Sequence, residues 1–217
     1  MTDKIDIKSM IVSPAATNCY FFHLKGNIEA ICVDPGDRGD AIADALEEEG
    51  LKLSAILLTP GHFDHIMGVE ALKKRFGAKV YAPKAEQRVL QDPALNLSGD
   101  LIGMPCTLDA DEYLEDNAVI REAGFEIHML LTPGHTEGGA CFYLPAEGIC
   151  FTGDTVFRAS IGRTDLPTGN FETLIDSIRS RIMPLPEDTV LLPGHEGTSV
   201  LEWEKLHNPY FRGDDEP

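Results

Sequence analysis

A short phrase recurs three times along this chain and constrains its fold more than any other feature. Each copy is an apolar run followed by proline, glycine and histidine: Leu57–His62, Leu130–His135 and Leu191–His195. Proline cannot continue a central strand and glycine permits a sharp bend. Each copy therefore predicts a strand that ends in a turn carrying an imidazole. Three of the seven histidines share this context.

The first and richest copy continues as His62-Phe63-Asp64-His65, and a further carboxylate, Asp154, follows another apolar run. Neutral imidazoles and carboxylates are ligands that zinc, iron and manganese share. The simpler alternative makes Asp64 a helix N-cap, Asp154 a turn residue and the histidines solvated polar groups. Together, six candidate ligands come from four strand ends, enough for two ions bridged by a carboxylate: His62, Asp64, His65, His135, Asp154 and His195.

The hydrophobic pattern predicts the elements around these turns. Strands are expected over residues 5–12, 19–24, 28–33, 55–58, from 80, 125–131, 140–144, 149–152 and 189–192, and helices over 40–49, 65–76, 171–182 and 200–207. Residues 91–106 predict an irregular loop that could cover a site. Strands come in runs separated by single helices, which favours the α/β class as a four-layer αβ/βα sandwich: two mixed β-sheets with helices on the outer faces. We expect one domain over residues 1–217.

The composition limits the kinds of partner and the cellular location that we expect. The 18 basic and 36 acidic residues give a net charge of −18, which disfavours nucleic acid and anionic membranes as non-specific partners. The five cysteines are odd in number and show no Cys-x-x-Cys spacing, so they are expected to be reduced thiols. The first nine residues carry charges, and no window approaches 18 apolar residues. A cytoplasmic location is predicted; the oligomeric state is left open.

The order and spacing of these motifs resemble the metallo-β-lactamase superfamily and, within it, the small glyoxalase II-like hydrolases. That family carries T-H-x-H-x-D-H, then a histidine in P-G-H-T, an aspartate in G-D and a late P-G-H. The matching segments here are Thr59–His65, Pro133–Thr136, Gly153-Asp154 and Pro193–His195, with weaker matches at Thr17–Tyr20, Val33–Gly36, Gly162–Asp165 and His207–Pro209. The resemblance covers nearly the whole chain and implies a metallo-β-lactamase-like fold.

One position departs from the family pattern, because Pro60 stands where the family has its first histidine. The resemblance implies a first metal site made by that histidine with His62, His135 and Asp154, of which only the last three remain. It implies a complete second site of Asp64, His65, His195 and the bridging Asp154. Losing a direct ligand should weaken binding by more than the roughly 10 to 100-fold that follows loss of a supporting partner. We expect the first site to be weak, completed by water or empty, and the chain to bind one or two Zn²⁺, with iron or manganese as alternatives.

The resemblance also implies a metal-dependent hydrolase of ester and thioester bonds, a small thioester of the hydroxyacyl-glutathione type being the favoured substrate. Metal coordination lowers the pKa of water from about 15.7 to about 7, so a metal-bound hydroxide is the expected nucleophile. Asp64 is the predicted catalytic residue, orienting the water or moving a proton. The alternative is a catalytically impaired metal- or metabolite-binding member of the same superfamily, because Pro60 weakens the two-metal centre.

Related chemistries are disfavoured. An iron persulfide dioxygenase of this superfamily would use the histidine that Pro60 replaces, a β-lactamase would normally be exported, and a nuclease should present a basic face. Four basic residues are candidates for attracting an anionic substrate, the simpler alternative being surface pairing with acids: Arg158, Arg163, Lys205 and Arg212.

Several further residues allow two interpretations each. Asn18 and Asp34 either support the metal loops or only form turns. Tyr20 and Tyr210 either border the pocket or pack as ordinary aromatic residues. His23 and His128 are predicted to be strand residues.

Overall fold

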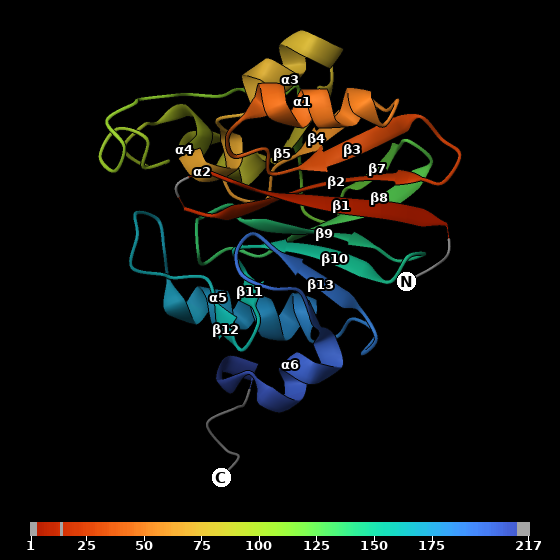
Figure 1. The fold of residues 1–217 in the computed structure, drawn as a ribbon. Helices are drawn as coiled ribbons and strands as arrows, with labels where there is room; N and C mark the ends of the chain where they lie inside the picture. Colours follow the sequence, from red (N-terminus) through yellow and green to blue (C-terminus); the bar gives the residue numbers. More distant parts are fainter. Residues whose placement is uncertain (1–3, 14, 212–217) are drawn as a thin grey trace.

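Figure 1 shows a computed structural model that describes residues 4–13 and 15–211. Two six-stranded sheets stack face to face, and helices cover the outer face of each. The predicted α/β sandwich with four layers and two mixed sheets is confirmed. Arg212 and the acidic residues 214–216 lie outside the described part of the chain.

The first sheet has the order β1-β2-β3-β4-β5-β6. Its strands are β1 (Ile5–Val12), β2 (Thr17–Leu24), β3 (Glu29–Val33), β4 (Lys52–Leu57), β5 (Lys79–Pro83) and β6 (Glu112–Leu114). The first three strands pair antiparallel, and β3 to β6 pair parallel. The parallel half needs helical crossovers, which is why helices cover this face.

The second sheet has the order β14-β13-β10-β9-β8-β7. Its strands are β7 (Val119–Glu122), β8 (Phe125–Leu131), β9 (Ala140–Leu144), β10 (Ile149–Gly153), β13 (Val190–Pro193) and β14 (Ser199–Val200). Only β10 and β13 pair parallel among these neighbours. A small hairpin follows β10, made of β11 (Val156–Phe157) and β12 (Ser160–Ile161).

The helices divide between the two outer faces. Over the first sheet lie α1 (Gly39–Glu48), α2 (Phe63–Ile66), α3 (Val69–Phe76) and α4 (Gln87–Gln91), the last preceded by a 3₁₀ turn at Lys84–Glu86. Over the second lie α5 (Phe171–Ser177), which continues as a π-helical turn over Ile178–Ile182, and α6 (Leu201–His207), followed by a 3₁₀ turn at Pro209–Phe211. No helix in residues 4–13 and 15–211 has the length and apolar character needed to cross a bilayer.

Three apolar layers hold the sandwich together. Between the sheets, Phe22 stacks on Phe151 with ring centroids 5.0 Å apart. Ile42 and Leu46 of α1 belong to the outer layer under the first sheet, and Leu174 of α5 to the layer under the second. Central strands such as β9 and β10 are buried along their whole length and carry apolar side chains on both faces, whereas β1 and β7 have exposed positions.

The predicted helix over residues 65–76 is wrong in one respect, because the structure breaks it into α2 and α3 at Gly68. The amide of Gly68 donates to the carbonyl of Pro35 at 2.7 Å, and a Cβ at this position would lie 2.6 Å from the same oxygen. This approach between distant segments ends the first helical turn. The strands β6, β7 and β14, the hairpin β11–β12 and helix α4 were not predicted, since most are too short to show a period.

Candidate metal centre

The structure brings all six candidate ligands together at the ends of four strands. His62 is the N-cap residue of α2, and α2 itself carries Asp64 and His65. This short helix follows the end of β4 in the chain. His135 follows β8, Asp154 directly follows β10, and His195 follows β13. All except His195 are buried, and His195 is half-buried.

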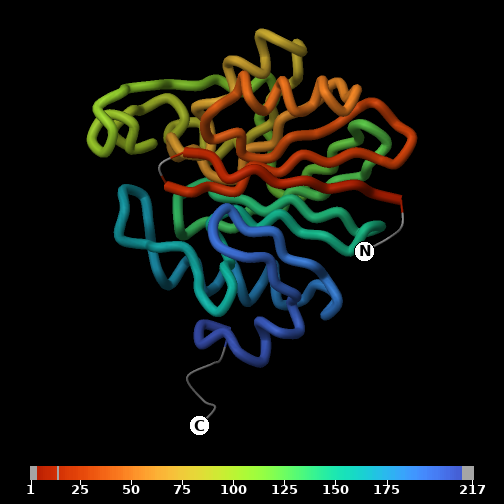
Figure 2. The backbone as a smooth tube through the Cα atoms, viewed as in Figure 1, coloured from red at the N-terminus to blue at the C-terminus, as the bar shows by residue number. Residues whose placement is uncertain are grey.

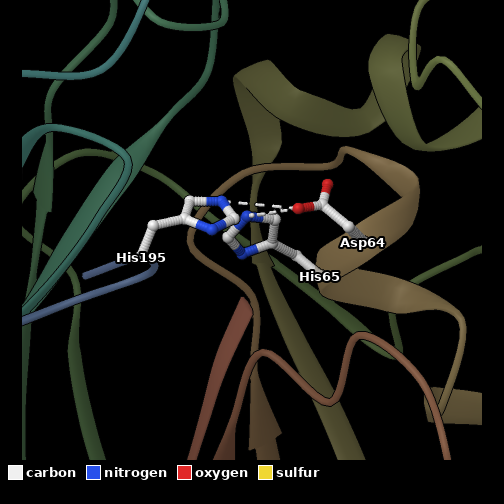
Figure 3. Close-up of side chains that lie close together, drawn as sticks. All are labelled: Asp64, His65 and His195. Atoms are coloured by element: carbon white, nitrogen blue, oxygen red, sulfur yellow. Dashed lines mark ion pairs between the residues drawn. The ribbon is translucent and has the colours of Figure 1, made fainter. Parts of the chain in front are cut away.

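Three of these residues form one compact group (Figure 3). Asp64 Oδ2 lies 3.4 Å from His195 Nε2 and 3.6 Å from His65 Nε2. One donor atom from each of the three lies within 4.8 Å of the other two. Asp154 adjoins this group, with Oδ1 3.5 Å from His65 Nε2 and Oδ2 3.4 Å from His195 Nε2.

The remaining donors lie on the other side of Asp154 and are called the first group, after the first metal site that the resemblance implies; Asp64, His65 and His195 are called the second group. His62 Nδ1 lies 3.0 Å from His135 Nε2, and His135 Nε2 lies 3.2 Å from Asp154 Oδ2. Asp154 is therefore within reach of both groups, which is the placement that a bridging carboxylate needs. A Cβ on Gly194 would lie 2.4 Å from Asp154 Oδ1, so the turn before His195 can approach this closely only as glycine.

The donors fit a metal because several have nothing else to bind. His62 Nε2, His65 Nε2 and Asp154 Oδ1 are buried without a hydrogen-bond partner. Buried polar atoms in native proteins nearly always have partners, and exceptions point to a missing ion or water. Imidazole nitrogen and carboxylate oxygen are ligands for zinc, iron and manganese.

The electrostatics of the cluster show strong coupling between acids and bases. Burial alone would lower the pKa of His195, but hydrogen bonds to Asp154 and Asp64 raise it to about 10. Burial likewise opposes ionisation of Asp64, yet the adjacent His65 lowers its pKa to about 2. His65 is desolvated, but Asp64 and Asp154 hold its pKa well above the usual value. Without metal, the carboxylates are ionised and these two histidines carry protons at neutral pH.

A metal must displace those protons, which makes its binding depend on pH. Only neutral imidazole ligates a metal, so binding at His65 and His195 should release up to two protons at pH 7. The apparent affinity should then rise with pH, by up to about tenfold per unit for each proton released. Calorimetric titration in buffers of different ionisation enthalpy counts the protons. An affinity that stays constant between about pH 6 and pH 8 would contradict this assignment of the protons.

Other side chains orient the candidate ligands. His65 Nδ1 lies 3.0 Å from Asp34 Oδ2, and Asp34 Oδ1 accepts the Thr59 amide at 2.8 Å. His135 Nδ1 lies 2.7 Å from the carbonyl oxygen of Arg163. The hydrogen bond to the Arg163 carbonyl orients the His135 ring, and the ion pair with Asp34 holds His65 in place; contacts on the nitrogen away from the metal orient many metal-binding histidines. Asp34 therefore does more than form a turn.

Three hydrogen bonds from Thr17 and Asn18 hold the loops that carry the candidate ligands. Thr17 Oγ1 donates to Asp64 Oδ2 at 2.8 Å, and Asn18 Nδ2 donates to the carbonyls of Pro193 and Glu196 at 3.0 and 2.9 Å. Asn18 thus ties β2 to the turn that carries His195. Thr17 was not predicted as a site residue, although it stands in a segment that resembles the family.

Tyr20 contacts the turn that carries His195, whereas Tyr210 and the remaining histidine candidates lie elsewhere. The Tyr20 hydroxyl donates to the Pro193 carbonyl at 2.9 Å, whereas Tyr210 packs against Phe171. His23 and His128 lie in β2 and β8, as predicted.

Glu86 is a buried carboxylate that the sequence did not reveal. It accepts the Gly61 amide at 2.7 Å and the Thr136 hydroxyl at 3.0 Å, so it joins the turn before His62 to the turn after His135. Its side chain is fully buried, and desolvation raises its pKa to about 7. No local pattern signals this role, because Glu86 stands in an ordinary polar run.

The raised pKa of Glu86 gives a prediction for stability. Its folded-state pKa of about 7 exceeds the value of 4.5 expected in the unfolded chain, so the folded state holds more protons between these pH values. The free energy of unfolding therefore falls as pH rises across this window, by up to about 3 kcal/mol from this group. Urea unfolding should show that Glu86→Gln removes that part of the slope, whereas the exposed-site control Glu70→Gln retains it. Parallel slopes for wild type and Glu86→Gln would contradict the assignment.

Pro60 stands where the family pattern has the histidine that would complete the first group. It is buried and lines a narrow internal gap together with Thr59, His135 and Asp154. Its ring therefore faces the same space as two of the candidate ligands and offers them no donor atom. The second group is complete without it.

A cavity of about 370 Å³ opens over the cluster. Its lining includes apolar side chains from the segment 91–106 and five of the six candidate ligands: His62, Asp64, His135, Asp154 and His195. The prediction that this segment covers a site is supported by Leu97 and Leu101, which line the cavity. Figure 2 shows the segment as the outermost yellow-green loop, on the same side of the molecule as the teal loop that follows β12.

Comparison with known proteins places this site in a family. The model described as "Metallo-beta-lactamase superfamily" matches residues 12–195, which include every candidate ligand. The hydroxyacylglutathione hydrolase GloC of Haemophilus influenzae is 34% identical over 188 residues, covering 84% of this chain and 87% of that protein.

Two solved structures support the same family assignment. The B3 metallo-beta-lactamase BLEG-1 superposes with a TM-score of 0.91 and 38% identity, over 96% of this chain and 100% of that one. TTHA1623, solved in a di-iron-bound form, superposes with a TM-score of 0.81 and 30% identity, over 94% of this chain and 99% of that one.

Proposed function

The chain belongs to the metallo-β-lactamase superfamily, and from that premise we propose that it is a metal-dependent hydrolase of thioesters. The observation that carries the proposal is Asp154, which lies within 3.5 Å of His65, His135 and His195 at the floor of a cavity. Nε2 of His62 and Nε2 of His65 are buried in the same cluster without a hydrogen-bond partner.

We propose that Asp64, His65, His195 and Asp154 hold one ion, and that His62, His135 and Asp154 form a weaker site beside it. A bound divalent ion would polarise a carbonyl oxygen and lower the pKa of water to about 7. Zinc, iron and manganese all suit these ligands, and the di-iron form of TTHA1623 supports a two-ion arrangement.

The chain's own residues have distinct roles in this proposal. Asp64 accepts a hydrogen bond from Thr17, which leaves its Oδ1 available to orient water or accept a proton. Asp34 holds His65 and the Arg163 carbonyl holds His135, so the rings do not reorient during the reaction. The apolar wall of the cavity excludes water from around the acyl group.

The thioester class is proposed from GloC, whose name states hydroxyacylglutathione hydrolysis. The test is turnover of S-lactoylglutathione by protein loaded with zinc, iron or manganese, with metal content measured on the same sample. We expect hydrolysis that a chelator abolishes and the metal restores. If the metal-loaded protein hydrolyses neither this nor any other thioester, the thioesterase proposal fails. The alternative, a catalytically impaired metal- or metabolite-binding protein, is then favoured.

The likeness to BLEG-1 favours one second candidate, hydrolysis of a β-lactam amide. Both reactions begin at an acyl carbonyl, so the same centre can serve either. Hydrolysis of the chromogenic cephalosporin nitrocefin, compared with the thioester on one preparation, separates them. A higher kcat/KM for nitrocefin would replace the thioester proposal.

A further inference from the structure

The wall of the cavity above the candidate ligands is largely apolar. Leu97 and Leu101 come from the segment 91–106, Phe157 and Ile161 from the hairpin β11–β12, and Leu166 from the loop beyond. The exposed fraction of Leu101 is 64%, so aliphatic surface remains open to a ligand. Such a wall favours an apolar group in the cavity.

Arg163 is the one lysine or arginine among the cavity-lining residues, and it is already engaged. Its Nε and Nη2 each lie 2.7 Å from an oxygen of Asp165, in a bidentate pair. The bond to Arg163 lowers the pKa of Asp165 to about 2, so the carboxylate stays ionised under working conditions. An approaching anion therefore meets a neutral pair instead of a free cation.

The other basic candidates within the described part of the chain, Arg158 and Lys205, do not line the cavity. Arg158 lies 5.0 Å from the ring centroid of Trp203, and Lys205 pairs with Glu187 at 3.4 Å. Neither belongs to the lining, whereas the acidic Glu196 does. The net charge of −18 adds a long-range field that repels anions.

Glutathione is a poor match for these surroundings, because it carries a net negative charge at neutral pH. We infer that the cavity selects thioesters whose acyl and thiol portions are both uncharged and partly apolar, in preference to glutathione thioesters. The inference rests on the proposed thioesterase function and specifies its substrate class. Arg163 and Asp165 are the specificity-determining pair.

The test uses two substrates with one acyl group, S-lactoyl-N-acetylcysteamine and S-lactoylglutathione, on metal-loaded protein. At low ionic strength we expect a kcat/KM about fivefold or more higher for the neutral substrate, mostly through KM. Salt should raise kcat/KM for the glutathione thioester and leave that of the neutral substrate unchanged, because screening removes repulsion of the anion alone. An equal or higher kcat/KM for the glutathione thioester at low salt would overturn the inference.

A matched pair of variants tests the residues. Asp165→Asn frees Arg163 and should reduce the preference for the neutral substrate by about threefold or more. Glu126→Gln removes a comparable exposed pair, Glu126 with Arg121, from the edge of the second sheet and should leave the preference unchanged. An unaltered preference in Asp165→Asn would contradict the role of the pair.

Binding separates this inference from the proposed function. The non-hydrolysable S-hexyl thioethers of N-acetylcysteamine and glutathione can be compared by calorimetry, and the neutral ligand should bind about fivefold more tightly. If the protein hydrolyses neither thioester but still binds the neutral ligand more tightly, the proposed thioesterase function is rejected and the inferred preference of the cavity stands. Equal or reversed binding would reject the selectivity itself.

Discussion

Pro60→His is expected to raise the metal content from about one to about two ions per chain. Pro60 faces the same internal gap as His135 and Asp154, so an imidazole there adds a third nitrogen to the group of His62 and His135. A restored direct ligand should strengthen the first site by at least the roughly 10 to 100-fold associated with supporting partners. We expect kcat to rise by about tenfold or more, because a second ion stabilises charge that one ion leaves uncompensated.

Elemental analysis after dialysis measures the ion content, and steady-state hydrolysis measures kcat. Pro133→His is the matched control, since Pro133 stands in the equivalent Pro-Gly-His turn. Pro133→His should raise neither the ion content nor kcat. Two ions in the wild type, or one ion in Pro60→His, would show that residue 60 does not control the first site.

Asp154→Asn is expected to remove metal from both groups and to lower kcat/KM by more than about 100-fold. Asp154 is the one carboxylate within 3.5 Å of histidines from both groups. An amide of nearly the same size keeps the packing but cannot supply the negative charge that the ions need. The loss should therefore exceed that of any single histidine variant.

The comparison requires a folded variant. Circular dichroism and the urea midpoint of the metal-free protein establish that the variant folds. The control Asp6→Asn, at a side chain that is 45% exposed, should keep both metal and activity. If Asp154→Asn retained two ions per chain, the bridging position of this carboxylate would have to be abandoned.

Much of the site could be predicted because its signals are local. Proline and glycine act on the residues beside them, so a strand ending in a turn with a histidine is visible without knowledge of the fold. These turns and the Gly-Asp at residue 154 grouped six candidate ligands, the resemblance divided them between two sites, and the structure brings them together: His62, Asp64, His65, His135, Asp154 and His195. Their role as ligands stays a prediction until metal is measured.

What could not be predicted depends on contacts between distant segments. Glu86 is a charged residue in a polar run, and only the packing of α4 against two turns buries it and gives it donors from Gly61 and Thr136. The break at Gly68 has the same origin, since the Pro35 carbonyl that it meets lies over thirty residues away.

The amino-acid sequence by itself determined which residues are candidate ligands and that Pro60 departs from the family pattern, because side-chain chemistry and turn formation are properties of short segments. Tertiary structure decided that Asp154 lies between the two groups and that Glu86 joins their turns. Those distances arise from the stacking of two sheets whose strands are far apart in the chain, and no local pattern encodes them.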